Sequence, residues 1–501
     1  MSPDGSKTTW KPAAREAGIR VRMYRVGFGD FFLVTFLDRN GKPLHVIVDC
    51  GVFRGKDQTG DLHSIEAAVS DMAQTTEGHV ALVVITHRHA DHIAGFARCE
   101  DAFRKLSVDA IWMPVWESEY EPVALKYQME LTRTALALEQ HFAALGADAT
   151  EADAVARAYM ENAIGEVPTG ASAVAGKGTN AKALELLKHG FADTKPQYYK
   201  SGDKPELPQA LVDAGLECEI LGPPPVTALE LMKLMNLQKN VGQYLAAVGQ
   251  ASGSTDDLKP FGSEWEIDPA LEPEKSEREF YTPESFREWN EERKSWGDIT
   301  GEEATRARLK MEANLQQLQP AAALTAAKQL NTFLNNQSLV VLFKFKGKKL
   351  LFVGDAQAGN WEHWLFDTDV PDKKAGGELS TDARQILTSL DFYKVGHHGS
   401  GNATPKVAAE TMGKQQKFIS MCSTQADVYG NEDPDNPAKG TEVPRLPLLE
   451  KLASESALVR SDQISITVNE KEIEAKVAAP LPAPPPGSRL EKGTLWVDCY
   501  L

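Results

Sequence analysis

Residues 86–92, with the sequence THRHADH, place three histidines and an aspartate within seven residues, although the whole chain of 501 residues has only 11 histidines. This stretch directly follows the apolar run HVALVVI at residues 79–85. A short apolar run of this kind is typical of a buried β-strand. Ligand sites of α/β folds form in the loops that follow such strands. We therefore expect an α/β sheet with a metal-binding loop at one edge.

Apolar runs and alternating patterns elsewhere predict further strands, with helices between them. Asn40-Gly41 marks a hairpin turn within residues 18–54, and Lys346-Gly347 marks a second turn in SLVVLFKFKGKKLLFVGD. The spacing of apolar residues predicts a helix over residues 119–147, and residues 150–165 are also expected to be helical. The other expected strands lie at residues 108–115, 417–423 and 457–469 and in the final run TLWVDCYL. Residues 215–225 are expected to form a strand stopped by three prolines, and residues 390–400 a strand followed by a loop.

The strand-rich stretches flank segments of different composition, which indicates a layered α/β sandwich with helical insertions. Residues 226–335 are strongly charged, carry tryptophans among carboxylates and show no strand signal. They are predicted to form a mostly helical insertion that could bind a protein partner or cover the site as a lid. The expected parts are a polar N-terminal tail at 1–17, a first half of the sandwich at 18–225 with a helical insertion at about 117–200, the charged insertion at 226–335, and a second half at 336–501 with a C-terminal extension.

The pattern HxHxDH favours two adjacent metal ions over one. His87 and His89 alternate along an extended loop and can turn toward the same point, whereas Asp91 and His92 project toward a neighbouring point. Imidazole suits borderline cations such as zinc, and a carboxylate beside an imidazole also suits a harder ion such as manganese. The loop therefore predicts half of a centre for two divalent ions, with zinc expected and manganese as the alternative.

Two more groups of donor residues lie far along the chain, again directly after apolar runs. Asp355 ends LLFVGDAQ, and His397-His398 occur in YKVGHHGS. A carboxylate can bridge two ions, and a late histidine can complete the donors around the second ion. Ser400 follows the histidine pair and could donate a hydrogen bond to a phosphate or carboxylate, although turn formation explains it equally well.

These motifs occur in an order that resembles the metallo-β-lactamase superfamily, and in particular the hydrolase domain of ComEC-type DNA-uptake proteins and their soluble relatives. The resemblance covers roughly residues 18–115, 205–225 and 335–470. It is carried by THRHADH together with Val26-Gly27-Phe28-Gly29-Asp30, Asp49-Cys50-Gly51, Asn335-Asn336-Gln337-Ser338-Leu339-Val340, Gly354-Asp355 and the run from His397 to Ser400.

The resemblance implies an αβ/βα four-layer sandwich and a role for each site residue. His87 and His89 would bind the first ion, Asp91 and His92 the second, and Asp355 both. Of the late pair, His397 is favoured as the last ligand of the second ion because it lies nearer the strand, and His398 is the alternative. Asp30 and Asp49 would hold the histidine loop, and Asp91, His398 and Ser400 are the predicted catalytic residues.

The sequence departs from the superfamily at one ligand position. Many members carry another histidine for the first ion after a middle strand, whereas this chain has Gly222 and Pro223 there. ComEC-type relatives commonly lack that histidine as well. The first ion is therefore expected to have only three protein ligands.

Two ions about 3.5–4 Å apart lower the pKa of a bridging water and supply hydroxide at neutral pH. The leading hypothesis is therefore a dinuclear metal-dependent hydrolase, a phosphodiesterase or nuclease acting through a metal-bridging hydroxide. One alternative is hydrolysis of an ester or lactone at the same ions. Another is an interaction protein whose metal site is idle or gated.

Composition narrows the substrate and the compartment. The formal net charge of −17 argues against a broad nucleic-acid-binding face and favours a short or single-stranded substrate over long duplex DNA. The five cysteines form no CxxC pair, which fits a reducing compartment. The start of the chain is polar, and no apolar run reaches the length of a membrane span. A cytoplasmic protein with no membrane contact is therefore expected.

Overall fold

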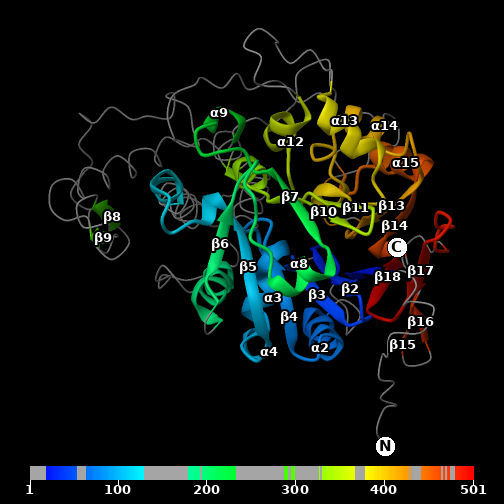
Figure 1. Ribbon diagram of the computed structural model, residues 1–501, viewed down its shortest axis with the longest axis horizontal. Coiled ribbons are helices and arrows are strands. Elements are labelled where there is room, and N and C mark those ends of the chain that lie inside the picture. The colour runs from blue at the N-terminus through cyan, green and yellow to red at the C-terminus, as the bar shows by residue number, and fades with distance from the viewer. Residues whose placement is uncertain are drawn as a thin grey trace, which may run out of the picture.

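A computed structural model shows a mixed α/β fold with two large sheets and helices around them (Figure 1). The residues that it describes are 18–53, 64–128, 179–191, 194–232, 287–290, 295–298, 327, 330–366, 379–426, 428, 430, 442–463, 466–468, 471–473 and 480–501.

The first sheet has eight strands in the order β17-β18-β1-β2-β3-β4-β5-β6. Strands β1 to β3 form an antiparallel meander, and β3 to β6 run parallel to one another. The expected hairpin at Asn40-Gly41 joins β2 to β3. The strands are β1 (Ile19–Tyr24), β2 (Phe31–Leu37), β3 (Pro43–Cys50), β4 (His79–Val84), β5 (Ser107–Pro114), β6 (Pro196–Tyr199), β17 (Arg489–Lys492) and β18 (Trp496–Tyr500).

The second sheet has six strands in the order β14-β13-β12-β11-β10-β7. The expected turn at Lys346-Gly347 joins β10 to β11 in an antiparallel pair, and β11 to β14 run parallel. The strands are β7 (Glu217–Gly222), β10 (Val340–Phe345), β11 (Lys348–Phe352), β12 (Phe392–Lys394), β13 (Phe418–Cys422) and β14 (Ser456–Arg460).

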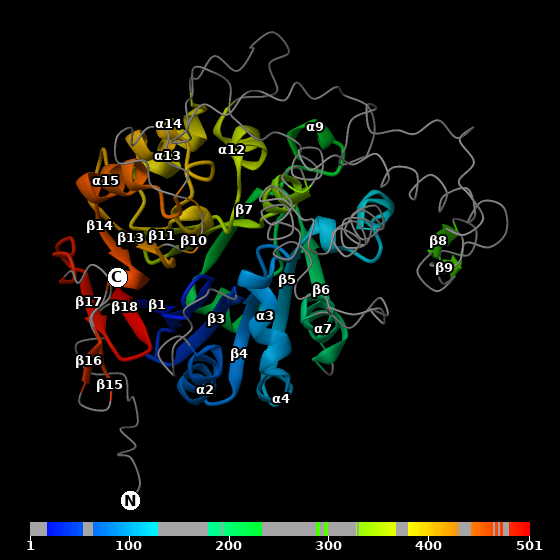
Figure 2. The ribbon, with the colours of Figure 1, turned by 180° about the vertical axis from the view of Figure 1, so that it is seen from behind.

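The helices gather in two groups on opposite sides of the molecule (Figures 1 and 2). With the first sheet lie α2 (Ile65–Thr75), α3 (Ala90–Arg98), α4 (Glu100–Phe103), α7 (Thr179–Glu185) and its π-helical continuation Leu186–Gly190. With the second sheet lie α12 (Ala358–Leu365), α13 (Thr381–Thr388), α14 (Lys406–Thr411) and α15 (Leu446–Glu455). The other short helices are Val115–Glu117, α8 (Gln209–Ala214), α9 (Leu229–Met232), Gly396–Gly399 and Ser461–Gln463.

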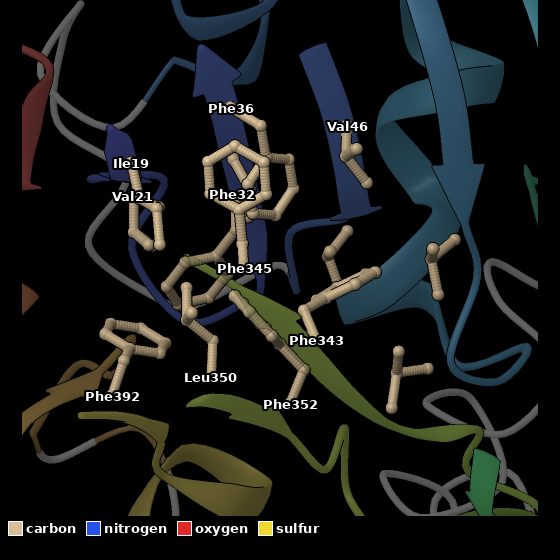
Figure 3. Packing of buried hydrophobic residues seen from close by; sticks show 14 of the residues in the cluster. Ile19, Val21, Phe32, Phe36, Val46, Phe343, Phe345, Leu350, Phe352 and Phe392 are labelled. Carbon is tan, nitrogen blue, oxygen red and sulfur yellow. The ribbon is translucent and has the colours of Figure 1, made fainter. Parts of the chain in front are cut away.

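The two sheets share one apolar core, in which side chains from the strands of both sheets pack together (Figure 3). The rings of Phe32 on β2 and Phe352 on β11 lie 5.9 Å apart between centroids. A second cluster packs the other face of the first sheet against α2 and α3, and a third packs the second sheet against α12 to α15. Each sheet is therefore covered on one face by the other sheet and on the opposite face by helices.

Strands β1 and β18 come from distant parts of the chain and pair side by side, with Arg22 opposite Asp498. The Arg22 guanidinium donates to both carboxylate oxygens of Asp498, at 2.7 and 2.8 Å. It also lies 3.8 Å over the ring of Trp496. This buried pair ties the C-terminal hairpin to the first sheet.

The predicted strands are confirmed, but the charged insertion contains strands that were not expected. The short antiparallel pair β8 (Arg287–Asn290) and β9 (Ser295–Asp298) contradicts the absence of strands there. Each strand carries a tryptophan, which favours β structure over helix. The strand expected at 457–469 is interrupted at Ser461–Gln463, and the short pair β15 (Ile466–Val468) and β16 (Lys471–Ile473) follows.

Of the helix predicted at 119–147, residues 122–128 are helical, and 129–147 lie outside the described residues, as do 1–17 and 150–165. Most of the insertion at 226–335 also lies outside them. The five cysteines form no disulfide. No described helix combines the length and apolar character that crossing a membrane requires.

Candidate metal centre

The histidine motif follows a buried strand, as the sequence predicts, but its second half, from Ala90 on, forms the start of a helix that the sequence analysis did not predict. The motif leaves β4 and enters α3, whose N-cap is His89. Asp91 lies in the first turn of α3, where the positive end of the helix dipole favours a carboxylate. His87, His89, Asp91 and His92 are all fully buried.

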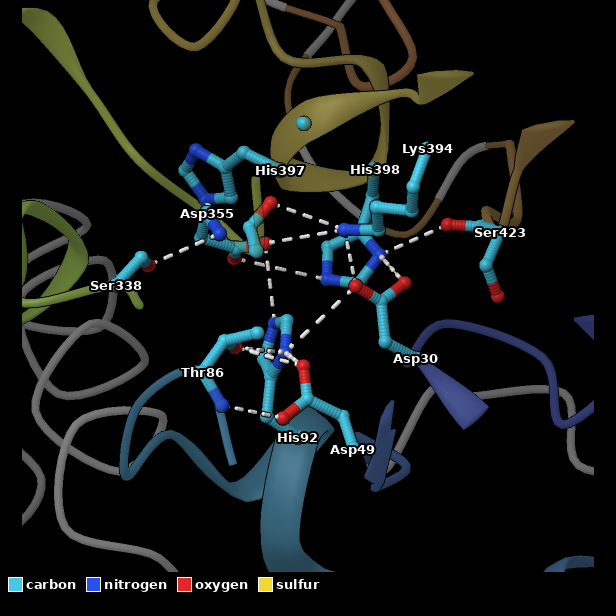
Figure 4. A network of polar contacts seen from close by, with 12 residues as sticks. Asp30, Asp49, Thr86, His92, Ser338, Asp355, Lys394, His397, His398 and Ser423 are labelled. Carbon is cyan, nitrogen blue, oxygen red and sulfur yellow. Dashed lines mark hydrogen bonds and ion pairs between the residues drawn. The ribbon is translucent and has the colours of Figure 1, made fainter. Parts of the chain in front are cut away.

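The ends of strands from both sheets bring the distant donor groups to this loop (Figure 4). Asp355 follows β11, and His397 and His398 follow β12, all in the second sheet. The loop itself belongs to the first sheet. The site therefore forms where the carboxyl ends of β4, β11 and β12 meet.

Two groups of buried donor atoms share the carboxylate of Asp355. One group is His87, His89 and Asp355, and the other is Asp91, His92, Asp355 and His398. Within each group the donor atoms lie within 4.8 Å of one another. One Asp355 oxygen lies 3.1 Å from His92 Nε2, and the other lies 4.0 Å from His87 Nε2. Asp355 therefore stands between the two groups.

Three of the histidines are anchored through Nδ1, which leaves Nε2 facing the centre. His92 Nδ1 lies 2.8 Å from Asp49 Oδ2, and His398 Nδ1 lies 2.8 Å from the carbonyl of Ser423. His87 Nδ1 lies 3.2 Å from the hydroxyl of Thr86. A second partner of this kind fixes the ring orientation of metal-binding histidines and raises their basicity.

Whether these residues fit metal ions can be judged from the buried polar atoms that have no hydrogen-bond partner. Such atoms include Nε2 of His87, both ring nitrogens of His89 and both carboxylate oxygens of Asp355. Leaving a buried polar atom unsatisfied costs about 1–3 kcal/mol, so several together indicate a ligand. Imidazole nitrogens and carboxylate oxygens are ligands that zinc accepts. The donor set therefore fits two divalent ions.

The pKa is lowered at His87 and His89 and raised at His92 and His398. Burial, reinforced by His92 and His89, holds the pKa of His87 well below its usual value, and burial lowers the pKa of His89 to about 4. Burial also opposes charge on His92, but Asp355 and Asp49 outweigh it and raise its pKa well above the usual range. The carboxylates likewise outweigh burial at His398 and raise its pKa.

The two late histidines contact different partners. Both adopt left-handed backbone conformations, with φ of 46° for His397 and 52° for His398. His398 Nε2 lies 3.0 Å from Asp91 Oδ2. His397 Nε2 lies 3.7 Å from Asp355, and its Nδ1 lies 3.1 Å from Asn402 Oδ1. The structure thus places His398 beside Asp91, where the sequence favoured His397. Such backbone costs of order 1–3 kcal/mol per residue and is typical of functional sites.

Ser400, predicted as catalytic, uses its hydroxyl within the turn. It donates to Asn402 Oδ1 at 2.8 Å. Asn402 Oδ1 in turn lies 3.1 Å from His397 Nδ1. The hydrogen bond of Ser400 agrees with the turn role that the sequence left open as an alternative, and its catalytic role stays a prediction.

Asp30 and Asp49 contact the histidine loop from the first sheet. Asp49 accepts hydrogen bonds from the backbone N–H and the hydroxyl of Thr86, at 2.7 and 2.6 Å. Asp30 lies 3.6 Å from His92 Nδ1 and forms an ion pair with Lys394. Lys394 is a buried residue that the sequence analysis missed. Its signal was a lysine inside the apolar strand LDFYKV, directly before the second histidine motif.

Arg88 lies between His87 and His89 in sequence and was also missed. Its guanidinium donates to both oxygens of the buried Glu117, at 2.6 and 2.7 Å. The backbone carbonyl of Arg88 accepts a hydrogen bond from Asn180 at 2.7 Å. These contacts fix the middle of the loop. No local pattern in the sequence links Arg88 to Glu117.

At Gly222, where many superfamily members carry a further histidine, the space is filled by Asn360 of α12. A Cβ atom added at Gly222 would lie 2.1 Å from Asn360 Oδ1. Asn360 is fixed by hydrogen bonds from its Nδ2 to the carbonyls of Asn336 and Ser338. His87, His89 and Asp355 would therefore be the protein donors of the first ion. Catalytic zinc sites commonly use three protein ligands and keep a further position for water or substrate.

Replacing the two late histidines separately should distinguish their roles. We expect H398A to lose the second ion, because His398 is one of its four donors, and H397A to retain both ions. Metal content after gel filtration measures this as moles of ion per mole of protein. Retention of two ions by H398A, with loss of one by H397A, would restore the assignment that the sequence favoured.

The arrangement brings together two neighbouring groups of buried donors that share one carboxylate and could each hold a divalent cation. Chemically, such a pair can activate water and stabilise negative charge on a substrate. A scan against protein-family models and a search of curated proteins find no match to this chain.

Proposed function

We propose that this chain is a hydrolase that depends on two divalent metal ions, and that its fold is the αβ/βα four-layer sandwich of the metallo-β-lactamase superfamily. The observation that carries the proposal is the carboxylate of Asp355, which belongs to two groups of buried donors at once. The fold assignment is supported by two sheets that share a core and carry helices on their outer faces.

Two bound ions would supply a nucleophile from water at neutral pH and would neutralise charge that develops on the substrate. The protein's part is to fix the donors. Thr86 and Asp49 hold the start of the loop, and the carbonyl of Ser423 holds His398. Because His87, His92 and His398 each have such a partner at Nδ1, these three donors are oriented before any substrate binds.

A phosphodiester is the proposed substrate class, in a nucleic acid or a nucleotide. The order of the motifs from Asp30 to Ser400, which resembles ComEC-type hydrolases, supports this choice over esters and lactones. The net charge of −17 favours short or single-stranded substrates.

The test is hydrolysis of bis-p-nitrophenyl phosphate and of short oligonucleotides by protein loaded with zinc, manganese or nickel. A panel of lactones and p-nitrophenyl esters, assayed in parallel, measures the competing activity. Turnover of phosphodiesters that disappears with a chelator is the expected result. Absence of phosphodiester turnover with all three metals would refute the proposal, and faster turnover of lactones would favour the ester hydrolase.

Metal binding should release protons, rather than take them up, because the pKa values of His92 and His398 are raised. The raised pKa values favour the protonated form of both imidazoles in the metal-free protein, and a protonated imidazole must lose its proton before Nε2 can bind an ion. We therefore expect the apparent affinity to rise with pH, by about tenfold per pH unit for each proton released. Titration calorimetry in two buffers of different ionisation enthalpy counts these protons. H79A, which removes an exposed histidine outside the centre, should release the same number, and binding without proton release would contradict the expectation.

A further inference from the structure

Lys394 places a positive charge inside the candidate metal centre. It is the last residue of β12 and directly precedes the loop that carries His397 and His398. Its side chain is only 2% exposed. Lysine is almost never fully buried unless it is paired, so its partners explain why it is there.

The ammonium group of Lys394 contacts three groups at the centre (Figure 4). It forms a close ion pair with Asp30, donates to the carbonyl of Gly354 at 3.0 Å and lies 3.7 Å from Asp355 Oδ1. Paired with the carboxylate of Asp30, the ammonium group places a positive charge beside the carboxylate shared by both donor groups.

Asp30 links this cation to the second metal position. Its two oxygens lie 3.6 Å from Nδ1 of His92 and 3.6 Å from Nδ1 of His398. Lys394 thus contacts Asp355 directly and reaches two other donors through Asp30. A lysine with a purely structural role would need only one carboxylate as a partner, and that partner would not have to be a metal ligand.

The charges at the loaded centre can be counted from the buried residues. Two divalent ions would balance the carboxylates of Asp30, Asp49, Asp91 and Asp355, while the coordinating histidines are neutral. A bridging hydroxide would add one negative charge, so the centre would be neutral with Lys394 and would carry one excess negative charge without it. A buried charge acts on a neighbouring anion through a lower dielectric constant than that of water.

We propose that Lys394 is a positioning and specificity-determining residue, which holds Asp30 and Asp355 in place and supplies the centre with a positive charge that favours anionic over neutral substrates. The substrate preference rests on the proposed hydrolase function, whereas the positioning of Asp355 does not. At a separation of several ångströms, one such charge changes the rate on an anion by about tenfold or more relative to a neutral substrate.

The experiment compares kcat/KM for the anion bis-p-nitrophenyl phosphate with that for neutral p-nitrophenyl acetate in the wild type and four variants. K394M removes the positive charge and should lower the phosphate-to-acetate ratio by about tenfold or more. D30N removes a negative charge and should raise the ratio. D30N/K394M removes both and should return the ratio to within about threefold of the wild type. K348M removes a lysine of the same sheet that pairs with Asp391 outside the centre, and should leave the ratio unchanged.

Cobalt-loaded proteins provide a readout that does not depend on turnover. We expect K394M to bind two ions but to change the visible absorption of cobalt, because Asp355 loses a neighbour, whereas K348M should match the wild type. If K394M does not fold, the opposite effect of D30N and the return of the ratio in the double variant still test the charge argument. An unchanged ratio in D30N, or a double variant that stays as low as K394M, would overturn the specificity role.

Failure of the hydrolase proposal would be recognisable separately. In that case the wild type turns over neither substrate, and the cobalt spectra alone decide the positioning role. Identical cobalt spectra for K394M and the wild type would overturn that role.

Discussion

Replacing Asp355 with asparagine should remove hydrolytic activity and lower the metal content from two ions to one or none. The carboxylate belongs to both donor groups, so its loss weakens both metal positions at once. Each ion contributes several kcal/mol to stabilising a transition state, and each 1.4 kcal/mol is a factor of ten in rate. We therefore expect a fall in kcat/KM of about a thousandfold or more, measured on bis-p-nitrophenyl phosphate together with the metal content.

Asp109→Asn is a matched control for this variant. Asp109 also pairs with a histidine, at 3.0 Å from His79, but its side chain is 38% exposed and lies outside the centre. This control should keep both ions and full activity. If D355N bound two ions with wild-type affinity, Asp355 could not be the shared ligand, and the dinuclear site would have to be abandoned.

Replacing Gly51 with alanine should destabilise the protein strongly and disturb the histidine loop. Gly51 directly follows β3, and an added Cβ atom would lie 2.1 Å from both Asp91 C and His92 N. These are backbone atoms of the first turn of α3, so the clash cannot be relieved by turning a side chain. We expect a loss of about 3 kcal/mol or more in the free energy of unfolding, measured by chemical denaturation, together with weaker metal binding.

Gly41→Ala tests whether this effect is specific to the close approach at Gly51. Gly41 lies in the β2–β3 turn with a φ of +78°, and an added Cβ atom would meet nothing within 4 Å. The positive φ alone should cost about 1–2 kcal/mol, without effect on metal binding. Equal losses in the two variants would mean that the clash with α3 is relieved in some other way.

The parts that could be predicted from the sequence depend on local patterns. After the exposed His79, HVALVVI is apolar because the rest of β4 is covered on both faces, so the strand and the position of its loop could be predicted. The donor residues of THRHADH and Asp355 follow such strands directly. The two strands belong to different sheets, so the meeting of these donors was expected from the resemblance and not from the edge of one sheet.

Features that depend on backbone conformation or distant contacts could not be predicted in this way. Which of His397 and His398 lies beside Asp91 depends on the left-handed backbone conformation of both residues. No residue type around them in the sequence predicts that conformation. The sequence alone gives Lys394 no special role, because its partners Asp30 and Asp355 are distant in the chain and are brought to it by β2 and β11. The β8–β9 pair was missed because charged residues around Trp289 and Trp296 hide a short strand pattern.

The pairing of β1 with β18 also has a consequence for how the protein is made. The partners Arg22 and Asp498 are 476 residues apart in the chain. At a synthesis rate of about 5–20 residues per second, β1 must wait on the order of half a minute to a minute and a half for its partner strand. Throughout that time one edge of the nascent β1–β2–β3 meander has exposed hydrogen-bonding groups that can pair with other chains. The first sheet is therefore the part of this protein that should depend most on a chaperone at the ribosome.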